Sequence, residues 1–540
     1  MKNKKYVLAL LPLLLLVSCD KGTNENQISA IDNLKSTGID EGVVLSWKSD
    51  DNALSYVIYQ DENKVGETDN NFYTIHNLNN NQNYNLGVQA KYASTVSKIS
   101  YISSKPEAGK DYDPFIDDLN TGLEKRIGNS KIKEMLEAGD VNTSATNISR
   151  FKKVINKMKG GESQTIAYIG GSITVGEKAT AFDNKNHQKG YAYYSYSWLK
   201  EHYDKNKNSL FINASISGTD SSIATVRLEK DVLQYNPDLV FVEFCANNGS
   251  SIFDKKTYES LIRRILLQDN NPAVVLLFSA VDYAINNQDG YMKPMGDYYH
   301  LPMFSCLNAL KKICGNIDQD LSDPIYKFFS ADGVHPNDQG HKLYAKNLVY
   351  VLKKIINSEL NEESYVVPTN PWSEGYDCFV NFNFVNNQTN SNSVKSLGSF
   401  EAKDTSCRVL KDTADVEAFQ NGWVKSSRNS NDALVFEVTC KNFFIIYLAG
   451  NPDISGDPEG KMIASYQNKD NTADNGSLKW DVGRTQKQTR LETIVDNGHG
   501  WQNPCCIILF DNVVNATYTI SIKMENISDL GTVLAVGYTN

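Results

Sequence analysis

The stretch Ile166-Ala167-Tyr168-Ile169-Gly170-Gly171-Ser172-Ile173-Thr174 decides how the middle of this chain folds. Its first four residues form a short apolar run of the kind found in buried parallel strands. The two glycines that follow allow a sharp turn, and Ser172 stands at that turn. A serine on a tight strand-to-helix turn exposes its hydroxyl beside free backbone N–H groups, as a nucleophile requires. A Gly-Gly-Ser turn without chemistry fits this segment equally well.

The sequence around this stretch alternates short apolar runs with helical stretches. The predicted strands are 165–169, 210–216, 239–244 and 273–280, and the predicted helices are 197–203, 222–233, 258–268 and 341–356. Strands that alternate with helices indicate a parallel sheet covered on both faces. We therefore expect an α/β domain over residues 161–360, preceded by a linker and helical lead-in over 107–160.

The amino-acid composition limits the classes of protein to which this chain can belong. The chain has 540 residues, 41% hydrophobic and 22% charged, which is typical of a globular protein of several domains. Its net charge of −10, without basic runs, argues against a nucleic-acid partner. The nine cysteines include no CxxC pair, and no Cys/His cluster has zinc spacing. We predict no metal and no other cofactor, and leave disulfide pairing and oligomeric state open.

The N-terminus has the features of an export signal. Lysines in residues 1–5 precede an apolar stretch over 6–17 that is too short to span a bilayer comfortably. The stretch ends in Leu-Val-Ser-Cys19, which resembles the lipobox of bacterial lipoproteins. The resemblance implies a signal peptide over 1–18, lipidation of Cys19 and a tether over 19–27. It also implies a lipid anchor in the bacterial cell envelope, in the outer membrane on its periplasmic or surface face. An ordinary signal peptide or a short anchor helix is the alternative.

Two regions flank the α/β section and are rich in short strands. Residues 28–106 contain apolar alternation, with a tryptophan on an early strand and a tyrosine after a later corner, and resemble a fibronectin type III domain. From 367 to 540 helical periodicity disappears, and Gly, Asn and Asp turns separate about seven short apolar runs. This pattern predicts a C-terminal β-sandwich of jelly-roll type.

Chemistry-bearing residues gather at the ends of the predicted parallel strands. In Asp332-Gly333-Val334-His335, the carboxylate can reach the imidazole Nδ1 and leave Nε2 free to take a proton. Asn247 and Asn248 follow one strand, and Gly218 ends another with an N–H that can face a ligand. Ligand sites of open α/β sheets collect at these ends. Taken singly, each segment is also compatible with an ordinary surface turn.

These four segments, in this order, resemble the motif blocks of the SGNH (GDSL-like) hydrolases, over roughly residues 160–357. The resemblance implies a flavodoxin-like, three-layer fold and a serine esterase. The residues that match the blocks in chain order are Ser172, Gly218, Asn247, Asp332 and His335. An α/β-hydrolase elbow is rejected, since that motif needs glycine where Thr174 stands and separates its acid widely from its histidine.

The family's roles carry over residue by residue. Ser172 is the expected nucleophile, His335 the base that receives its proton, and Asp332 the residue that orients the imidazole. The backbone N–H groups of Ser172 and Gly218, with the side-chain amide of Asn247, are the expected oxyanion hole. Three nearby residues, Arg227, Thr174 and Glu243, are expected to be structural or supporting.

The substrate is less well determined by the sequence. An exported, lipid-anchored domain of this kind with β-sandwich accessories resembles carbohydrate esterases that remove O-acetyl groups from glycans. Candidate substrate-binding residues are Asn248, which replaces the family's more usual aspartate, and Trp501 in an aromatic, Asn-rich segment whose ring is equally compatible with packing. The alternatives are a catalytically inactive glycan-binding surface lipoprotein, and a short-chain acyl esterase or lysophospholipase with a non-glycan substrate.

Overall fold

The computed structural model describes most of the chain between residues 30 and 540. The described ranges are 30–50, 52–108, 127–143, 147–180, 190–281, 285–314, 329–358, 365–387, 392–404, 421–450, 458–483, 504–511 and 513–540. The chain divides into two compact units, Met1–Pro114 and Phe115–Asn540. The expected signal peptide, Cys19 and Trp501 lie outside the described residues.

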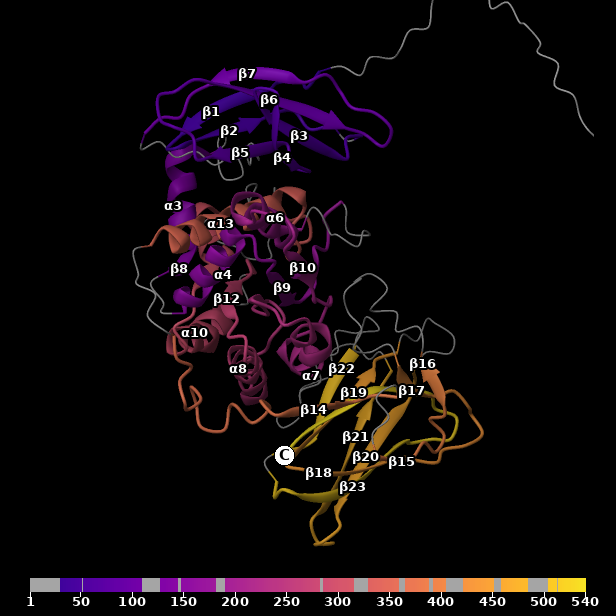
Figure 1. Ribbon diagram of the computed structural model, residues 1–540. Helices are drawn as coiled ribbons and strands as arrows, with labels where there is room; N and C mark the ends of the chain where they lie inside the picture. Colours follow the sequence, from indigo (N-terminus) through magenta and orange to yellow (C-terminus); the bar gives the residue numbers. More distant parts are fainter. Residues whose placement is uncertain are drawn as a thin grey trace, which may run out of the picture. The chain divides into compact units, whose positions relative to one another are not determined.

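The N-terminal unit consists of two antiparallel sheets around one core (Figure 1). One sheet has the strand order β1-β2-β5 and the other the order β4-β3-β6-β7. The strands are β1 (Lys35–Ile39), β2 (Gly42–Ser46), β3 (Ser55–Gln60), β4 (Asn63–Thr68), β5 (Phe72–His76), β6 (Tyr84–Lys91) and β7 (Ser100–Ser104). Trp47 and Tyr56 pack at a ring-centroid distance of 5.1 Å inside this core, which is built from residues of both sheets.

The second unit begins with the expected α/β domain. Its sheet has the order β10-β9-β11-β12-β13-β8, with all neighbours parallel except β8. The strands are β8 (Asp140–Asn142), β9 (Thr165–Gly170), β10 (Leu210–Asn213), β11 (Leu239–Glu243), β12 (Ala273–Phe278) and β13 (Met303–Ser305). Strands β9, β11 and β12 are buried along their whole length, as continuous apolar runs in a doubly covered sheet require.

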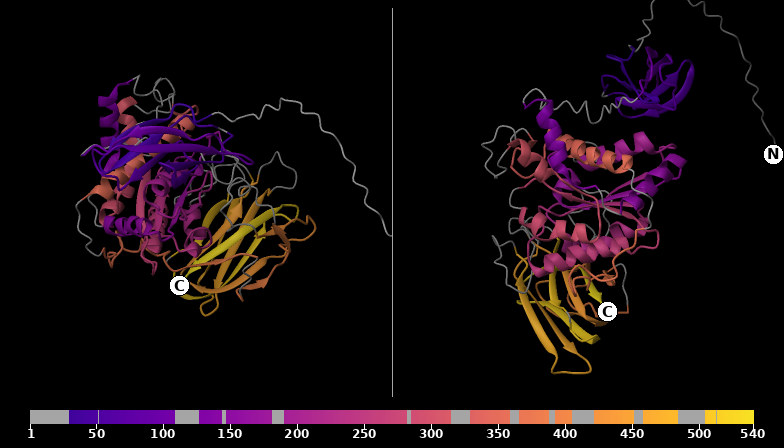
Figure 2. Two further views of the ribbon diagram at one scale, coloured as in Figure 1. Left: turned by 45° about the horizontal axis from the view of Figure 1, so that its top comes forward. Right: turned by 90° about the vertical axis from the view of Figure 1, so that its left-hand side faces the viewer.

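Helices cover both faces of this sheet (Figure 2). Helices α4, α6 and α13 pack together on one face, while α7 and α8 pack on the other. The helices are α3 (Asn129–Gly139), α4 (Ile148–Gly160), α5 (Ser172–Val175), α6 (Tyr191–Tyr203), α7 (Ser221–Asp231), α8 (Ile252–Leu266), α9 (Ile285–Asn287), α10 (Lys293–Tyr298), α11 (Cys306–Cys314) and α13 (Asp338–Asn357), with the short 3₁₀-helix η1 (Leu233–Tyr235) and the short π-helix η3 (Gln288–Met292).

Side chains that bond to backbone N–H groups fix where the main helices start. Asp220 accepts hydrogen bonds from the first turn of α7, and Asn337 does the same for α13. At α8, Ser251 and Asp254 form a reciprocal capping box. Helix α7 follows β10, and helix α8 follows β11. These caps therefore also fix where the loops at the carboxyl ends of the two strands end.

The C-terminal part of this unit is formed by two further antiparallel sheets. One has the order β16-β17-β24-β19-β22, with β14 also paired to β24, and the other has the order β15-β18-β23-β20-β21. The strands are β14 (Phe382–Val385), β15 (Val394–Ser396), β16 (Ala402–Asp404), β17 (Gly422–Lys425), β18 (Leu434–Cys440), β19 (Asn442–Leu448), β20 (Lys461–Asn468), β21 (Asn475–Asp481), β22 (Pro504–Phe510), β23 (Ala516–Met524) and β24 (Gly531–Thr539).

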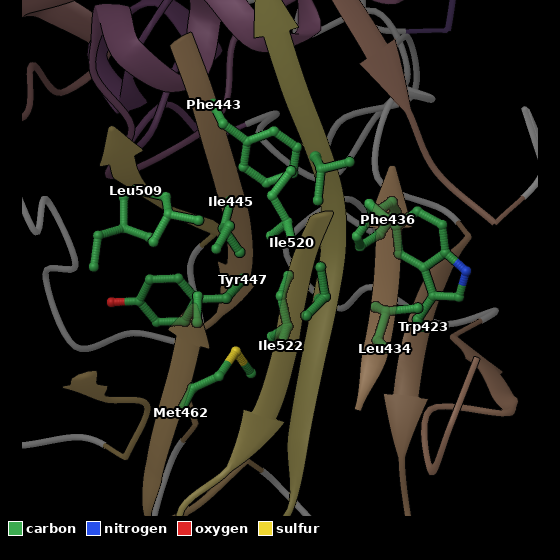
Figure 3. Close-up of a cluster of buried hydrophobic side chains, with 14 of the residues drawn as sticks. Trp423, Leu434, Phe436, Phe443, Ile445, Tyr447, Met462, Leu509, Ile520 and Ile522 are labelled. Atoms are coloured by element: carbon green, nitrogen blue, oxygen red, sulfur yellow. The ribbon is translucent and has the colours of Figure 1, made fainter. Parts of the chain in front are cut away.

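Alternate residues of β19 point in opposite directions and build two different cores. Figure 3 shows Phe443, Ile445 and Tyr447 facing Ile520 and Ile522 of the other sheet. The residues between them face the α/β domain, in a cluster whose buried members are Ile216, Ile223, Val226, Phe253, Phe379, Phe444, Ile446, Cys506, Leu534 and Ala535. The strand pattern of period two therefore buries both faces of this sheet.

The sequence predicted the long elements and missed the short ones. Each of the four predicted parallel strands and four predicted helices is present, although α6 begins at Tyr191 rather than 197 and α8 at Ile252 rather than 258. Strand β10 ends at Asn213 rather than 216, although the N–H groups of Ala214 and Ile216 still bond to Tyr168 O and Gly170 O. Strands β8 and β13 have three residues each, too few for a pattern. Among the described helices, none has the length and apolar character needed to cross a bilayer.

Candidate active site

The serine turn is fixed by close packing around two glycines. Strand β9 ends at Gly170, and Ser172 is the first residue of the one-turn helix α5. A Cβ at Gly170 would lie 2.5 Å from the Thr174 hydroxyl, and one at Gly171 would lie 2.1 Å from Asn247 Oδ1. Any side chain at these two positions would displace its neighbours. The Gly-Gly sequence is therefore what allows the Ser172 hydroxyl to reach the carboxyl edge of the sheet.

The structure brings Ser172, His335 and Asp332 together. Ser172 Oγ lies 2.9 Å from His335 Nε2, and His335 Nδ1 lies 2.9 Å from Asp332 Oδ2. An ionised Asp332 requires a proton on Nδ1, which leaves the Nε2 lone pair for the serine hydroxyl. Residues that lie 163 positions apart in the sequence thus form one chain of hydrogen bonds.

The loop that carries the histidine is held by its own hydrogen bonds. Asp332 Oδ1 accepts the backbone N–H groups of Val334 (3.0 Å) and His335 (2.8 Å). The Ser330 hydroxyl donates to the His335 carbonyl over 2.9 Å and accepts the Gly333 N–H over 3.0 Å. Burial raises the pKa of Asp332, but the hydrogen bonds from His335 and Val334 lower it to about 2. Asp332 is therefore ionised at neutral pH and orients the imidazole.

The residues expected to form the oxyanion hole lie on loops next to this turn. Gly218 has a φ of 72° in the loop between β10 and α7, a conformation that favours glycine. Two residues earlier, the N–H of Ile216 donates to Gly170 O over 3.1 Å, which ties this loop to the serine turn. The Asn247 side chain packs against Gly171, and its Oδ1 is buried without a hydrogen-bond partner among the described residues. Because Oδ1 is an acceptor, the group that this amide can offer to an oxyanion is its Nδ2 N–H.

Asn248, a predicted substrate-binding residue, has its side chain occupied within the protein. Its Oδ1 accepts the Ser221 N–H over 2.9 Å, and its Nδ2 donates to the hydroxyls of Ser221 (2.8 Å) and Tyr291 (3.1 Å). These contacts brace the loop after β11 against the start of α7. Contact between Asn248 and a substrate stays a prediction, as does the role of Trp501.

The residues expected to be supporting lie in the core below the site. The Thr174 hydroxyl donates to Glu243 over 3.1 Å, and burial raises the pKa of that carboxyl group. Arg227 is fully buried, donates to Ala214 O and pairs with Asp231 over 3.0 Å. These contacts join the ends of β9, β10 and β11 beneath the triad. Among the described residues, no cluster of three or more His, Cys, Asp or Glu side chains is arranged to hold a metal ion.

The sequence reasoning missed one carboxylate at the site. Glu177 Oε2 lies 3.3 Å from His335 Nε2, the nitrogen that also meets Ser172. Gly176, with a φ of 100°, ends helix α5 and turns the chain back toward the imidazole. The sequence signal for this residue was weak, because it consisted only of a glutamate five residues after the serine and directly after a glycine.

Comparison with known proteins assigns part of the chain to a family. Residues 168–343 match the GDSL-like lipase/acylhydrolase family. No curated protein sequence matches the chain.

Two solved structures, both of a two-domain esterase described as active on acetylated mannans, are similar to this chain. One, co-crystallised with mannopentaose, has a TM-score of 0.56 at 22% identity and covers 75% of this chain and 98% of its own. The other has a TM-score of 0.55 at 23% identity and covers 75% of this chain and 99% of its own. At this identity the likeness establishes the fold alone. The family match and the residues assembled within it identify an ester-bond hydrolase of SGNH type: this chain contains a GDSL-like lipase/acylhydrolase domain.

Proposed function

We propose that this protein is a serine esterase that removes O-acetyl groups from a polysaccharide or oligosaccharide through an acyl-enzyme. The observation that carries the proposal is the continuous hydrogen-bond chain from Ser172 through His335 to Asp332. Its order, hydroxyl to imidazole to carboxylate, is the one that activates a serine as a nucleophile.

In the first half-reaction, Nε2 of His335 takes the hydroxyl proton of Ser172 as Oγ attacks the acetyl carbonyl carbon. The carbonyl π electrons move to oxygen and form a tetrahedral oxyanion. When this intermediate collapses, the bond to the sugar oxygen breaks, and the proton on Nε2 passes to the leaving alkoxide. Water then repeats the sequence on the acetyl-serine and releases acetate.

The proposed oxyanion hole consists of the backbone N–H groups of Ser172 and Gly218 and the amide of Asn247. The full negative charge of the intermediate lies on one oxygen, so several fixed donors stabilise it more than the neutral ester. Loss of a single donor of this kind typically lowers turnover ~10²–10³-fold. Asn247→Ala should fall in that range.

Support for a glycan substrate comes from the domain arrangement. An SGNH domain joined in one compact unit to a large β-sheet region is the arrangement shared over 75% of this chain with an esterase described as active on acetylated mannans. The substrate class is our proposal, because that similarity at 22% identity concerns the fold.

The first test is hydrolysis of p-nitrophenyl acetate and release of acetate from acetylated mannan and xylan. We expect turnover of both kinds of substrate, and a loss of ~10³-fold or more in Ser172→Ala with the fold intact. A folded wild-type protein without turnover would favour a glycan-binding role instead. A preference for octanoyl over acetyl esters would favour a lipid substrate. Activity should survive EDTA, because no step needs a metal.

We also propose identities for the flanking regions and the N-terminus. The two-sheet N-terminal unit is assigned as fibronectin type III-like over 28–106, and the C-terminal sheets as a jelly-roll-like sandwich over 367–540. Lipidation of Cys19 would anchor the protein in the cell envelope. Incorporation of labelled palmitate that is lost in Cys19→Ser is the expected result, and secretion of unlabelled protein would contradict the anchor.

A further inference from the structure

A second carboxylate faces the imidazole from the side opposite Asp332. Asp332 Oδ2 lies 2.9 Å from Nδ1, whereas Glu177 Oε2 lies 3.3 Å from Nε2. The side chain of Glu177 is 33% exposed, and its Oε2 lies beside the same nitrogen that meets the Ser172 hydroxyl. None of the catalytic steps described above uses this residue.

The backbone of Glu177 is held on both sides. Its N–H donates to the carbonyl of Ser172 over 3.1 Å, and its carbonyl lies 3.2 Å from Nε2 of His341. Burial lowers the pKa of His341 to about 4, so this ring is neutral at the pH of catalysis. Its Nδ1 accepts the Tyr191 N–H over 3.3 Å, which leaves a proton on Nε2 for the Glu177 carbonyl.

These two hydrogen bonds connect the backbone of Glu177 to the segment that carries the nucleophile and to the helix that follows the histidine loop. The nucleophile turn supplies one anchor, and helix α13, which directly follows the histidine loop, supplies the other through His341. Movement of Glu177 relative to Ser172 would break one of the two contacts. The backbone of Glu177 is therefore fixed at a point from which its side chain reaches Nε2.

A carboxylate at this position acts differently on the two states of His335. In the resting state Nε2 carries a lone pair and no proton. The Glu177 carboxylate 3.3 Å away therefore has no favourable interaction with it. After Nε2 has taken the Ser172 proton, the ring is a cation with a proton on that nitrogen, and the same carboxylate attracts it. An interaction that becomes favourable only as the reaction proceeds lowers the barrier.

We propose that Glu177 is a positioning residue of this esterase, which stabilises the protonated His335 during acylation and deacylation. The inference rests on the proposed function. Because a carboxylate is a weaker base than an imidazole, Glu177 stabilises the charge and leaves the proton on Nε2 for the leaving alkoxide. The charged and titratable groups around the ring are Asp332 at Nδ1, Glu177 at Nε2, and His341 with Asp338 on α13.

The test compares Glu177→Gln with wild type on p-nitrophenyl acetate from pH 5 to 9. The glutamine keeps the shape but not the charge. We expect kcat to fall about fivefold with KM within about twofold, in keeping with the modest strength of a partly exposed charge pair. The acidic limb of the profile should move to lower pH, because the neighbour that favours the protonated ring has been removed. Glu177→Asp should restore part of the lost kcat.

Glu162→Gln is the matched control, since it removes the same charge from an exposed position at the end of α4. It should change neither kcat nor the profile. The inference is wrong if Glu177→Gln keeps the wild-type kcat and acidic limb, or if it raises KM alone.

A readout without turnover separates this inference from the proposed function. The chain has seven histidines, so the ring signals of His335 can be assigned in NMR spectra by their loss in His335→Ala. In Glu177→Gln the ring should lose its proton at a lower pH than in wild type. An identical titration in both proteins would overturn the role of Glu177 even if the enzyme acted on an unexpected substrate. Absence of Ser172-dependent hydrolysis with a shifted titration would overturn only the proposed function.

Discussion

The N-terminal and C-terminal regions of antiparallel sheet in this chain differ in what their sheet faces pack against. The N-terminal unit buries its apolar residues in one core between its own two sheets. The C-terminal region has such a core as well, but the opposite face of one sheet shares a second core with helices α7 and α8. A folded region with a self-contained core can act as an independent module, whereas a region that completes another domain's core is part of that domain.

The shared core reaches close to the proposed oxyanion hole. Ile216 belongs to it and lies two residues before Gly218 in the loop that follows β10. On the other side of the cluster, Phe444 of β19 packs against Phe253 at a centroid distance of 6.2 Å and against Phe379 at 4.7 Å. The C-terminal sheets therefore support the loop after β10 through the shared core, whether or not they contact a substrate.

Truncation should give the largest effect. A chain of residues 115–364 exposes the apolar side chains of Ile223, Val226 and Phe253, which the C-terminal sheets cover in the intact unit. We expect it to aggregate or unfold and to lose activity, because an exposed apolar patch of this kind is costly. Soluble yield and esterase rate, compared with residues 115–540, measure this. A shortened chain with full activity would show that the two regions are separable.

Phe444→Ala should destabilise the second unit by about 3–5 kcal/mol, the usual cost of emptying a buried aromatic site. Urea unfolding followed by loss of esterase activity gives the value. The matched change in the other region is Ile58→Ala, which empties the self-contained core. That substitution should leave the unfolding midpoint of the activity unchanged, and a common shift in both variants would contradict the independence of the units.

The shared interface should also make stability depend on pH. Burial and the carboxylate of Asp254 raise the pKa of Asp220 to about 7, although hydrogen bonds from Ser222 and Ile223 oppose the rise. A raised pKa means that Asp220 contributes its full stability below its ordinary value of 3.8. That contribution is lost as pH rises toward 7, and should amount to about 2 kcal/mol between pH 5 and 8.

Asp220→Asn keeps the side-chain oxygen that caps α7 and removes the charge. We expect it to abolish most of this fall in stability, as measured by urea unfolding at pH 5, 6, 7 and 8. The exposed carboxylate of Asp432 provides the control, and Asp432→Asn should keep the wild-type slope. An unchanged slope in Asp220→Asn would assign the pH dependence to another group.

Removal of residues 1–114 should have the smallest effect. The catalytic residues and both cores of the second unit lie within Phe115–Asn540. Turnover of p-nitrophenyl acetate should stay within about twofold of wild type, and the melting temperature of the second unit should not change. A loss of tenfold or more would mean that the N-terminal unit contributes to the active site.

The sequence-based predictions were most accurate where the residues that determine a feature are close together in the chain. The strands β9, β11 and β12 are continuous apolar runs, so their positions followed from composition alone. Asp332 and His335 are three residues apart, and hydrogen bonds within the loop that joins them hold their side chains together. The short strand β13 and the early start of α6 left no such trace, because their conformations depend on the elements packed around them.

The sequence alone was enough to predict the Gly-Gly-Ser turn, the oriented histidine and the alternation of strands and helices, since each depends on residues close together in the chain. The tertiary structure alone decided that Ser172 and His335 meet, that Glu177 faces the same nitrogen, and that Phe444 packs on the hydrolase domain. Those contacts join segments far apart in sequence or depend on how a turn is aimed. The free energies of these contacts come from packing and charge between atoms that meet only in the folded chain. The spacing of residues in the sequence therefore does not predict them.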